Sequence, residues 1–382
     1  KANTTADDNV AVGYQALFAN TTASNNVAVG KSAGANATTG LVDSVLVGYQ
    51  AGGSGTQGSY TVGVGYNSLY NNTGNNNTGC GYNTLFANTS GANNTAVGLQ
   101  ALDANTTASD NTAIGHNALT TNVIGTRNTA VGSGALITNT ASDNVAVGYL
   151  ALDTTSTGSN NTAVGTECMN ANTTGSGNVA MGYRTLDANT TGGSNVAIGQ
   201  YALSDNTTAG GNTAVGYAAL TDNTTGDSNT AVGFECVEKC TTGIHNTGMG
   251  YRAGFTQTTG SYNITIGNFT GDAITTAQNN TLMGYGSGSG ITTGSNNTVL
   301  GMQAGASLTT GASNILIGKE ANVSSSGNSE LVIGNAISGI ANNTGLIYPP
   351  GGGNMYQASN SSTWAQTSDE RIKKNIVDNN EG

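Results

Sequence analysis

The sequence contains few charged residues. Asp, Glu, Lys and Arg together make up 8% of the 382 residues, whereas typical domains contain about 25%. The formal net charge is −11, with only ten Lys and Arg residues. Proteins that bind nucleic acid usually carry a basic patch that neutralises phosphates, so this composition argues against a nucleic-acid partner.

Proline, cysteine and long apolar runs are also scarce. The chain has two prolines and four cysteines, and the four cysteines are too few for a disulfide framework. No apolar run approaches the roughly 20 residues that cross a bilayer as a helix, so membrane insertion is not expected. Glycine is abundant, with 58 residues, but it has no Gly-X-Y period, which excludes collagen.

A 17-residue repeat runs through most of the chain. The segment Asn212–Ser228 is followed by a second copy that starts at Asn229, and a marker glycine recurs at intervals of 17 residues, give or take one. A fixed period of this length is typical of a repeat architecture. The regular apolar positions also argue against disorder, which the low charge and abundant polar residues would otherwise suggest. The marker glycines are Gly13, Gly30, Gly48, Gly65, Gly81, Gly98, Gly115, Gly132, Gly148, Gly165, Gly182, Gly199, Gly216, Gly233, Gly250, Gly267, Gly284, Gly301, Gly318 and Gly334.

Each repeat predicts a short strand before its marker glycine, which is numbered position 0. Position −1 is Val, Ile, Leu, Met or Cys in every copy, and position −3 is Val, Thr, Ile or Leu. This alternation predicts a strand whose −3 and −1 side chains face the core, while the small residue at −2, usually Ala, faces the other way. On this orientation Val215→Asp would bury an unpaired charge and disrupt the stack locally.

The rest of the repeat predicts a second apolar contact and a turn. Positions +3 and +4 are commonly Ala-Leu, as at Ala219 and Leu220, and position +1 is often aromatic. Asn, Thr and Gly follow, which are turn-forming residues. Copies such as Ala51-Gly52 and Ala304-Gly305 lack the leucine, and the Asn at +7 disappears after Cys240, so the cross-section is expected to change there.

Stacking lets coils of this length share a core that none could form alone. We predict an all-β parallel β-roll or β-solenoid of about twenty 17-residue coils over residues 1–334, with Asn ladders along the stack. Residues 335–367, which contain Pro349 and Pro350, are predicted to form a neck or linker.

The pattern Asn-Thr-Ala-Val-Gly-Tyr-x-Ala-Leu resembles the head repeats of trimeric autotransporter adhesins, which also occur in viral and phage tail fibres. The resemblance covers about residues 7–334, although this period is longer than the usual head repeat. It implies a homotrimer, intertwined or packed side by side. A monomeric β-solenoid is the structural alternative.

The C-terminal segment resembles the start of the self-cleaving intramolecular chaperone domain of phage tail spikes and other fibres. The matching pattern is Ser368-Asp369-x-Arg371-x-Lys373-x-Asn375-Ile376, and residues 368–382 cover only the start of that domain. The resemblance implies that Ser368 is a nucleophile, that Lys373 is its base, and that cleavage falls between Thr367 and Ser368. A solvated charged tail is the alternative.

Other candidate chemistry is weaker. Cys236 and Cys240 lie four residues apart near His245, so a disulfide or a metal site is conceivable, but the spacing requires neither. His116 replaces the usual Tyr at +1 and is expected to be a surface substitution. Asp and Glu are scattered singly, so we predict no enzyme beyond one-time self-cleavage, no metal and no cofactor. Many Asn-x-Thr triplets match glycosylation acceptors, including Asn20, Asn105, Asn172, Asn189, Asn206 and Asn223.

Taken with these resemblances, the sequence predicts a structural fibre protein of a virus or phage. It would form a trimeric rod on the virion that attaches to a host-cell receptor, either a glycan or a surface protein. A trimeric adhesin head on a bacterial cell surface is the first alternative. A monomeric surface-binding or ice-binding solenoid is the second, because rows of Thr could match a lattice.

Overall fold

The computed structural model describes residues 4–348, 355–357 and 365–366. Within these residues all regular secondary structure is β, and the chain divides into two compact units, residues 1–210 and 211–382. Each unit is a parallel β-solenoid in which every coil contributes one three-residue strand. The predicted fold class and the 17-residue coil are therefore confirmed.

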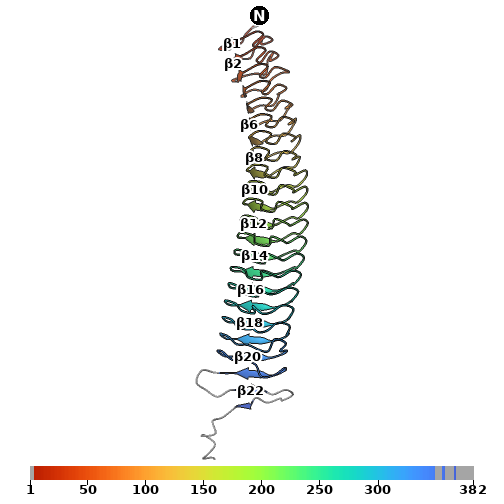
Figure 1. Cartoon of the computed structure of the whole chain (residues 1–382). Coiled ribbons are helices and arrows are strands. Elements are labelled where there is room, and N and C mark those ends of the chain that lie inside the picture. The colour runs from red at the N-terminus through yellow and green to blue at the C-terminus, as the bar shows by residue number, and fades with distance from the viewer. Residues whose placement is uncertain (1–3, 349–354, 358–364, 367–382) are drawn as a thin grey trace, which may run out of the picture. The chain divides into compact units, whose positions relative to one another are not determined.

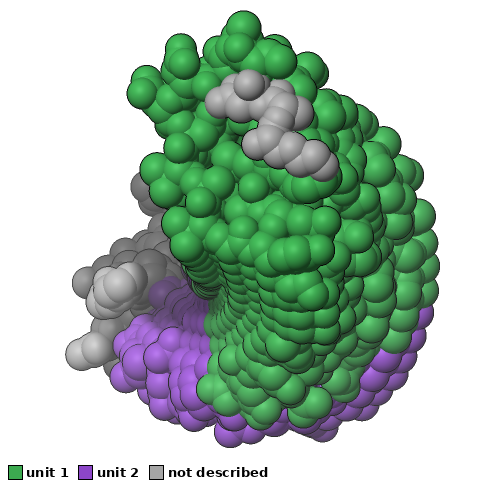
Figure 2. All heavy atoms as spheres, turned by 90° about the horizontal axis from the view of Figure 1, so that it is seen from above, with its two compact units in different colours: residues 1–210 green, residues 211–382 purple. Residues whose placement is uncertain are grey.

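Unit 1 stacks twelve strands in strict register. Neighbouring strands are parallel and pair equivalent residues, so that Thr95, Ala96 and Val97 lie beside Thr112, Ala113 and Ile114. Because the register repeats, equivalent atoms form columns along the stack (Figures 1 and 2). The strands are β1 (Val10–Val12), β2 (Val27–Val29), β3 (Val45–Val47), β4 (Val62–Val64), β5 (Thr78–Cys80), β6 (Thr95–Val97), β7 (Thr112–Ile114), β8 (Thr129–Val131), β9 (Val145–Val147), β10 (Thr162–Val164), β11 (Val179–Met181) and β12 (Val196–Ile198).

Unit 2 has the same kind of coil and ends in a small antiparallel arrangement. Strand β21 pairs in parallel with β20 and adds one rung after the last marker glycine, and β22 and β23 then pair antiparallel. The strands are β13 (Thr213–Val215), β14 (Thr230–Val232), β15 (Thr247–Met249), β16 (Ile264–Ile266), β17 (Thr281–Met283), β18 (Thr298–Leu300), β19 (Ile315–Ile317), β20 (Leu331–Ile333), β21 (Gly345–Ile347), β22 (Met355–Gln357) and β23 (Ala365–Gln366).

The predicted orientation of the strand side chains is wrong. From β2 to β20 the middle residue of each strand, at position −2, is buried, whereas the residues at −3 and −1 are partly or largely exposed. Ala214 is fully buried, for example, and its neighbour Val215 is only half-buried. The reason is space: where a leucine fills +4, the coil interior leaves room for only a small residue at −2. Larger residues occupy −2 in β16–β20, where +4 is not leucine.

The sizes of the residues at −2 and +4 compensate one another. Most coils of unit 1 combine Ala at −2 with a fully buried Leu at +4, such as Leu102 or Leu119. In the coil of β3, Leu46 occupies −2 and Gly52 occupies +4, and a Cβ on Gly52 would lie 2.7 Å from Leu46 Cδ1. Leu282 and Gly288 repeat this exchange in unit 2. In these coils the larger residue at −2 fills the space that the leucine fills elsewhere, whereas the coils of Gly34 and Gly254 have Ala28 and Gly248 at −2 and show no such exchange.

The leucines at +4 adopt a left-handed backbone conformation. Leu102 and Leu119, for example, have φ values of +51° and +52°. This conformation costs about 1–2 kcal/mol in a non-glycine residue, and burial of a leucine side chain offsets a cost of that size. A glycine at +4, such as Gly52 with φ +59°, adopts the same conformation without that cost.

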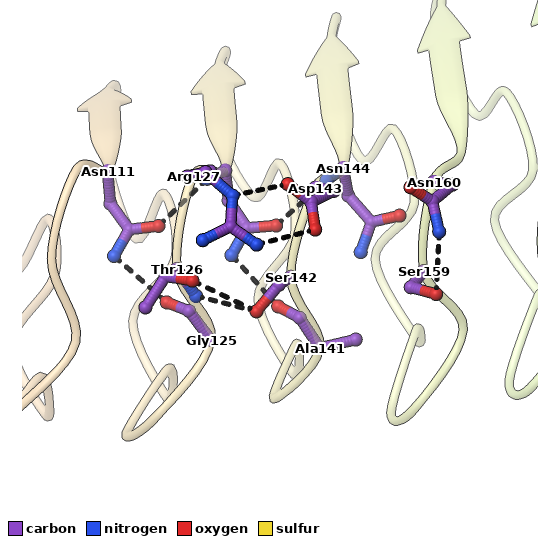
Figure 3. Close-up of polar contacts among 11 residues, drawn as sticks. Asn111, Gly125, Thr126, Arg127, Ala141, Ser142, Asp143, Asn144, Ser159 and Asn160 are labelled. Carbon is purple, nitrogen blue, oxygen red and sulfur yellow. Dashed lines mark hydrogen bonds and ion pairs between the residues drawn. The ribbon is translucent and has the colours of Figure 1, made fainter.

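Two columns of buried asparagine tie the coils together, as predicted. At −4, the Asn111 side-chain amide donates to Gly125 O at 2.9 Å, and its Oδ1 accepts from Asn128 N of the next coil at 2.9 Å (Figure 3). At +7, Asn189 Nδ2 donates to Asn172 Oδ1 at 2.8 Å. Later in unit 2 the +7 column becomes apolar, with Ile274, Ile291 and Leu308 fully buried, so apolar packing replaces the asparagine bonds there.

Candidate interaction surface

The outward positions −3 and −1 form an uncharged face on each unit, with Thr at −3 in ten of the twenty strands β1–β20. We call this surface the strand face. In strands β1–β20 every residue at these positions is Val, Ile, Leu, Met, Thr or Cys. The exposed fraction reaches 41% at Ile114, 42% at Met181 and 45% at Met249 and Met283. Because β-strand side chains alternate, −3 and −1 lie on one side of the sheet and form two parallel columns.

No charged side chain lies on the strand face of β1–β20, although charged residues occur elsewhere on the coils. The ion pairs of the described residues lie elsewhere on the coils, and several connect neighbouring coils, as between Arg127 and Asp143 at 2.6 Å (Figure 3). Arg184 with Glu167 and Lys239 with Asp222 make similar contacts. Solvent-facing strand positions usually carry polar or charged residues, so a long uncharged face is typical of a surface that another protein covers.

Exposed aromatic side chains at +1 stack along each unit. The rings of Tyr49 and Tyr66 are 5.0 Å apart between centroids and nearly parallel, and Tyr82 continues the stack at 5.1 Å from Tyr66. In unit 2, Phe234 stacks on both Tyr217 and Tyr251. These spacings approach the roughly 4.8 Å between neighbouring strands, so the coil repeat itself places the rings in contact. Each of these stacks spans three coils and adds aromatic surface beyond the marker glycine.

The predicted cleavage site lies outside the described residues. Thr367, Ser368 and Lys373 are all in the C-terminal segment that begins after Gln366. The self-cleavage assigned to them remains a prediction from the resemblance. Within the described residues, no group of three or more His, Cys, Asp or Glu side chains is placed to hold a metal ion.

The cysteines are separate free thiols rather than a disulfide pair. Cys236 and Cys240 are both buried, and each Sγ donates to a backbone carbonyl oxygen, that of Ala253 or Gly243, at 3.6 Å. Burial raises the pKa of Cys168 and Cys236 to about 12 and that of Cys240 to about 11, so these thiols stay protonated at neutral pH. Cys80, by contrast, lies on the strand face and is exposed.

The Asn-x-Thr triplets serve the asparagine ladder. Asn105, Asn172, Asn189 and Asn206 are fully buried at +7, and the Asn172 side-chain amide donates to Gly175 O at 3.0 Å. A glycan cannot be attached to a buried amide without unfolding the coil. His116 at +1 is exposed, as expected.

Comparison of the chain with known protein families, with curated proteins and with solved structures finds no match. The likeness to adhesin heads and to fibre chaperones therefore depends on the repeat and on the C-terminal motif alone. No helix that is long and apolar enough to cross a membrane occurs within the described residues.

The columns at −3 and −1 were predicted from the sequence, but they were predicted to face the core, whereas they face outward. One signal could have corrected it. In three coils, Leu or Val at −2 coincides with Gly at +4, at Leu46 and Gly52, Leu282 and Gly288, and Val299 and Gly305. A reciprocal exchange of size between two positions indicates that both fill the same interior.

Proposed function

We propose that the chain is the repeat shaft of a homotrimeric attachment fibre of a virus or phage, in which the strand face is the contact surface between chains. The observation that carries the proposal is the uncharged strand face. It carries only Val, Ile, Leu, Met, Thr and Cys, it faces outward, and it repeats along strands β1–β20 of the two units. Association of chains would remove these side chains from water, which stabilises by about 25 cal/mol per Å² of apolar area.

The three-fold symmetry of the proposal comes from the resemblance of the repeat to adhesin heads. The strand face by itself favours coverage by another protein surface, and it does not determine how many chains associate. A parallel trimer is consistent with the repeat because identical columns can meet around one axis, where each residue contacts its own copies. Attachment to a glycan or a surface protein is the function that the same resemblance implies.

A bacterial trimeric adhesin head uses the same kind of repeat and is the second candidate. The chaperone-like motif that begins at Ser368 favours the fibre, because autotransporters end in a membrane anchor. An ice-binding solenoid is less consistent with the hydroxyl pattern. Threonines at +8, such as Thr173 and Thr190, donate their hydroxyls to carbonyl oxygens of the next coil rather than presenting them to an ice lattice.

Two measurements test the proposal. Light scattering combined with sedimentation should give three times the chain mass of 37.9 kDa. The labelled protein should then adsorb to the surface of candidate host cells, and pre-incubation with soluble receptor glycan or protein should block the adsorption. A monomer in solution that adsorbs to no cell surface would overturn the fibre and favour a self-sufficient solenoid.

A further inference from the structure

The last coil of the solenoid carries a glutamate where the asparagine ladder would continue. Position −4 is Asn in the preceding coils of unit 2, including Asn297 and Asn314, and becomes Glu330 before β20. Its backbone N–H still donates to Asn314 Oδ1 at 2.9 Å, so the residue keeps its place in the ladder. An ionised carboxylate has no donor, however, so its side chain cannot make the amide-to-carbonyl bond of the ladder.

The carboxylate of Glu330 is buried and incompletely partnered. The residue is 3% exposed, and its Oε2 has no hydrogen-bond partner. Two glycines pack against it: a Cβ on Gly327 would lie 2.5 Å from Oε1, and a Cβ on Gly339 would overlap Oε2. None of the ion pairs among the described residues involves Glu330, and burial raises the pKa of its carboxyl. A buried carboxylate in such a place needs a proton or a cation.

A cavity of about 210 Å³ lies beside Glu330. It is lined by Ser324, Glu330 and the segment 339–342. Ser324 and Asn342 are exposed, so the cavity is accessible from solvent. Both also carry side-chain oxygen atoms, of which Asn342 Oδ1 already accepts a hydrogen bond from Asn328 N at 2.9 Å, and the backbone adds carbonyl oxygens. The lining therefore combines one negative charge with neutral oxygen donors, and its volume exceeds that of a single water molecule.

We propose that this cavity binds one Ca²⁺ ion, with the Glu330 carboxylate as its charged ligand. Ca²⁺ accepts carboxylate, hydroxyl and carbonyl oxygens in a flexible arrangement, whereas Mg²⁺ demands near-ideal octahedral geometry. With a single carboxylate the site is weak, with a Kd on the order of 10⁻⁴ to 10⁻³ M, the range of extracellular calcium modules. The bound ion neutralises the buried charge and holds segment 339–342 over the end of the solenoid.

The test is calorimetric titration of the whole chain with CaCl₂ at neutral pH, after removal of metal with EDTA. The variant Glu330→Gln removes the charge and keeps the shape, and an amide at this place can take up the ladder bonds, so the fold is retained. Glu320→Gln is the matched control, because Glu320 lies in the same unit, carries the same charge and pairs with Lys319 at 3.2 Å on the surface. Ser324→Ala tests a neutral ligand at an exposed position that the fold does not need.

Wild type and Glu320→Gln are expected to bind one Ca²⁺ per chain, Glu330→Gln to lose at least tenfold in affinity, and Ser324→Ala to lose several-fold. Calcium should also slow hydrogen exchange at the backbone amides of Gly339 and Asn343, which bond to Asn322 O and Asn328 O. The proposal is overturned if wild type binds no Ca²⁺ at about 10 mM, ten times the weak end of the expected range. It is equally overturned if Glu330→Gln binds as wild type does.

Discussion

Ala113 and Ile114 are neighbours in strand β7, yet they lie on opposite sides of the coil wall. Ala113 is fully buried, and Ile114 is 41% exposed on the strand face. The smaller residue therefore fills the core and the larger one faces outward. The inward orientation of position −2 and the outward orientation of position −1 repeat in both units, although −2 holds a larger residue such as Leu46 or Leu282 in some coils. Position −2 therefore stabilises the single chain, and position −1 is available for contact between chains.

A charged substitution should destabilise the coil strongly at the inward position of Ala113 and only slightly at the outward position of Ile114. Ala113→Asp places a carboxylate in a filled apolar interior and should cost more than about 3 kcal/mol of local stability. Ile114→Lys leaves the coil intact within about 0.5 kcal/mol, because its side chain points to solvent in the isolated chain. Hydrogen exchange of the coils around β7, measured under conditions that keep the chain monomeric, separates the two variants. Equal destabilisation by both would contradict the assigned orientation.

The asparagine ladder predicts that a glycosylation triplet is structural. Asn172→Ala and Thr174→Ala both destroy the same Asn-x-Thr triplet, but only Asn172 takes part in the ladder. Loss of its side chain removes the bonds to Gly175 O and from Asn189 Nδ2, which should cost about 2–3 kcal/mol. Thr174 is exposed, so Thr174→Ala should change stability little. Denaturant unfolding followed by circular dichroism measures both, and a reversed order would refute the ladder assignment.

The stability cost of replacing a glycine should depend strongly on its position in the coil. Gly165 has φ +141°, and a Cβ there would overlap the carbonyl oxygen of Gly182 in the next coil. Gly165→Ala should therefore destabilise by at least about 3 kcal/mol. Gly177 has φ +70° and open space around it, and the equivalent residue one coil earlier is Asn160. Gly177→Asn should be neutral or stabilising by up to about 1 kcal/mol, as thermal melting of the two variants would reveal.

Thiol reactivity should distinguish Cys80 from the other three cysteines. The thiolate is the reactive form, and burial raises the pKa of Cys168, Cys236 and Cys240 to about 11 or 12. At pH 8 an alkylating reagent should therefore modify only Cys80 in the folded chain, and all four thiols after denaturation. Association through the strand face should slow the labelling of Cys80, so its rate should fall as protein concentration rises. A rate independent of concentration would argue against coverage of this position.

The fold could be predicted from the sequence because the constraint is local and repeated. The marker glycine, the β-branched residues around it and the turn-forming Asn and Thr recur in register, and parallel stacking is the arrangement in which they pair. The direction of Val215 and Ala214 could not be derived in the same way, because alternation identifies two faces without saying which is inside. That choice depends on the volume enclosed by the coil, to which distant positions such as Gly52 and Leu46 contribute jointly.

The candidate surface was predicted less completely than the fold. The columns at −3 and −1 were predicted, but they were predicted to lie in the core. Their outward orientation follows only from the three-dimensional structure of the coil. The cavity at Glu330 left no clear pattern in the sequence. It depends on segment 339–342, which lies in the coil between β20 and β21, beyond the last marker glycine. Gly339 contacts the carboxylate there, and no period marks that contact.

The most direct test of the central claim is the solution mass of two forms of the chain, measured by sedimentation over a range of concentrations. Wild type should sediment as a trimer. A variant with Ile114, Val147 and Met181 each changed to Lys should sediment as a folded monomer, since the lysines would place like charges together at the interface while leaving each coil intact. A wild-type chain that remains monomeric at every concentration, or a variant that still forms the trimer, would contradict the assignment of the strand face as the contact between chains.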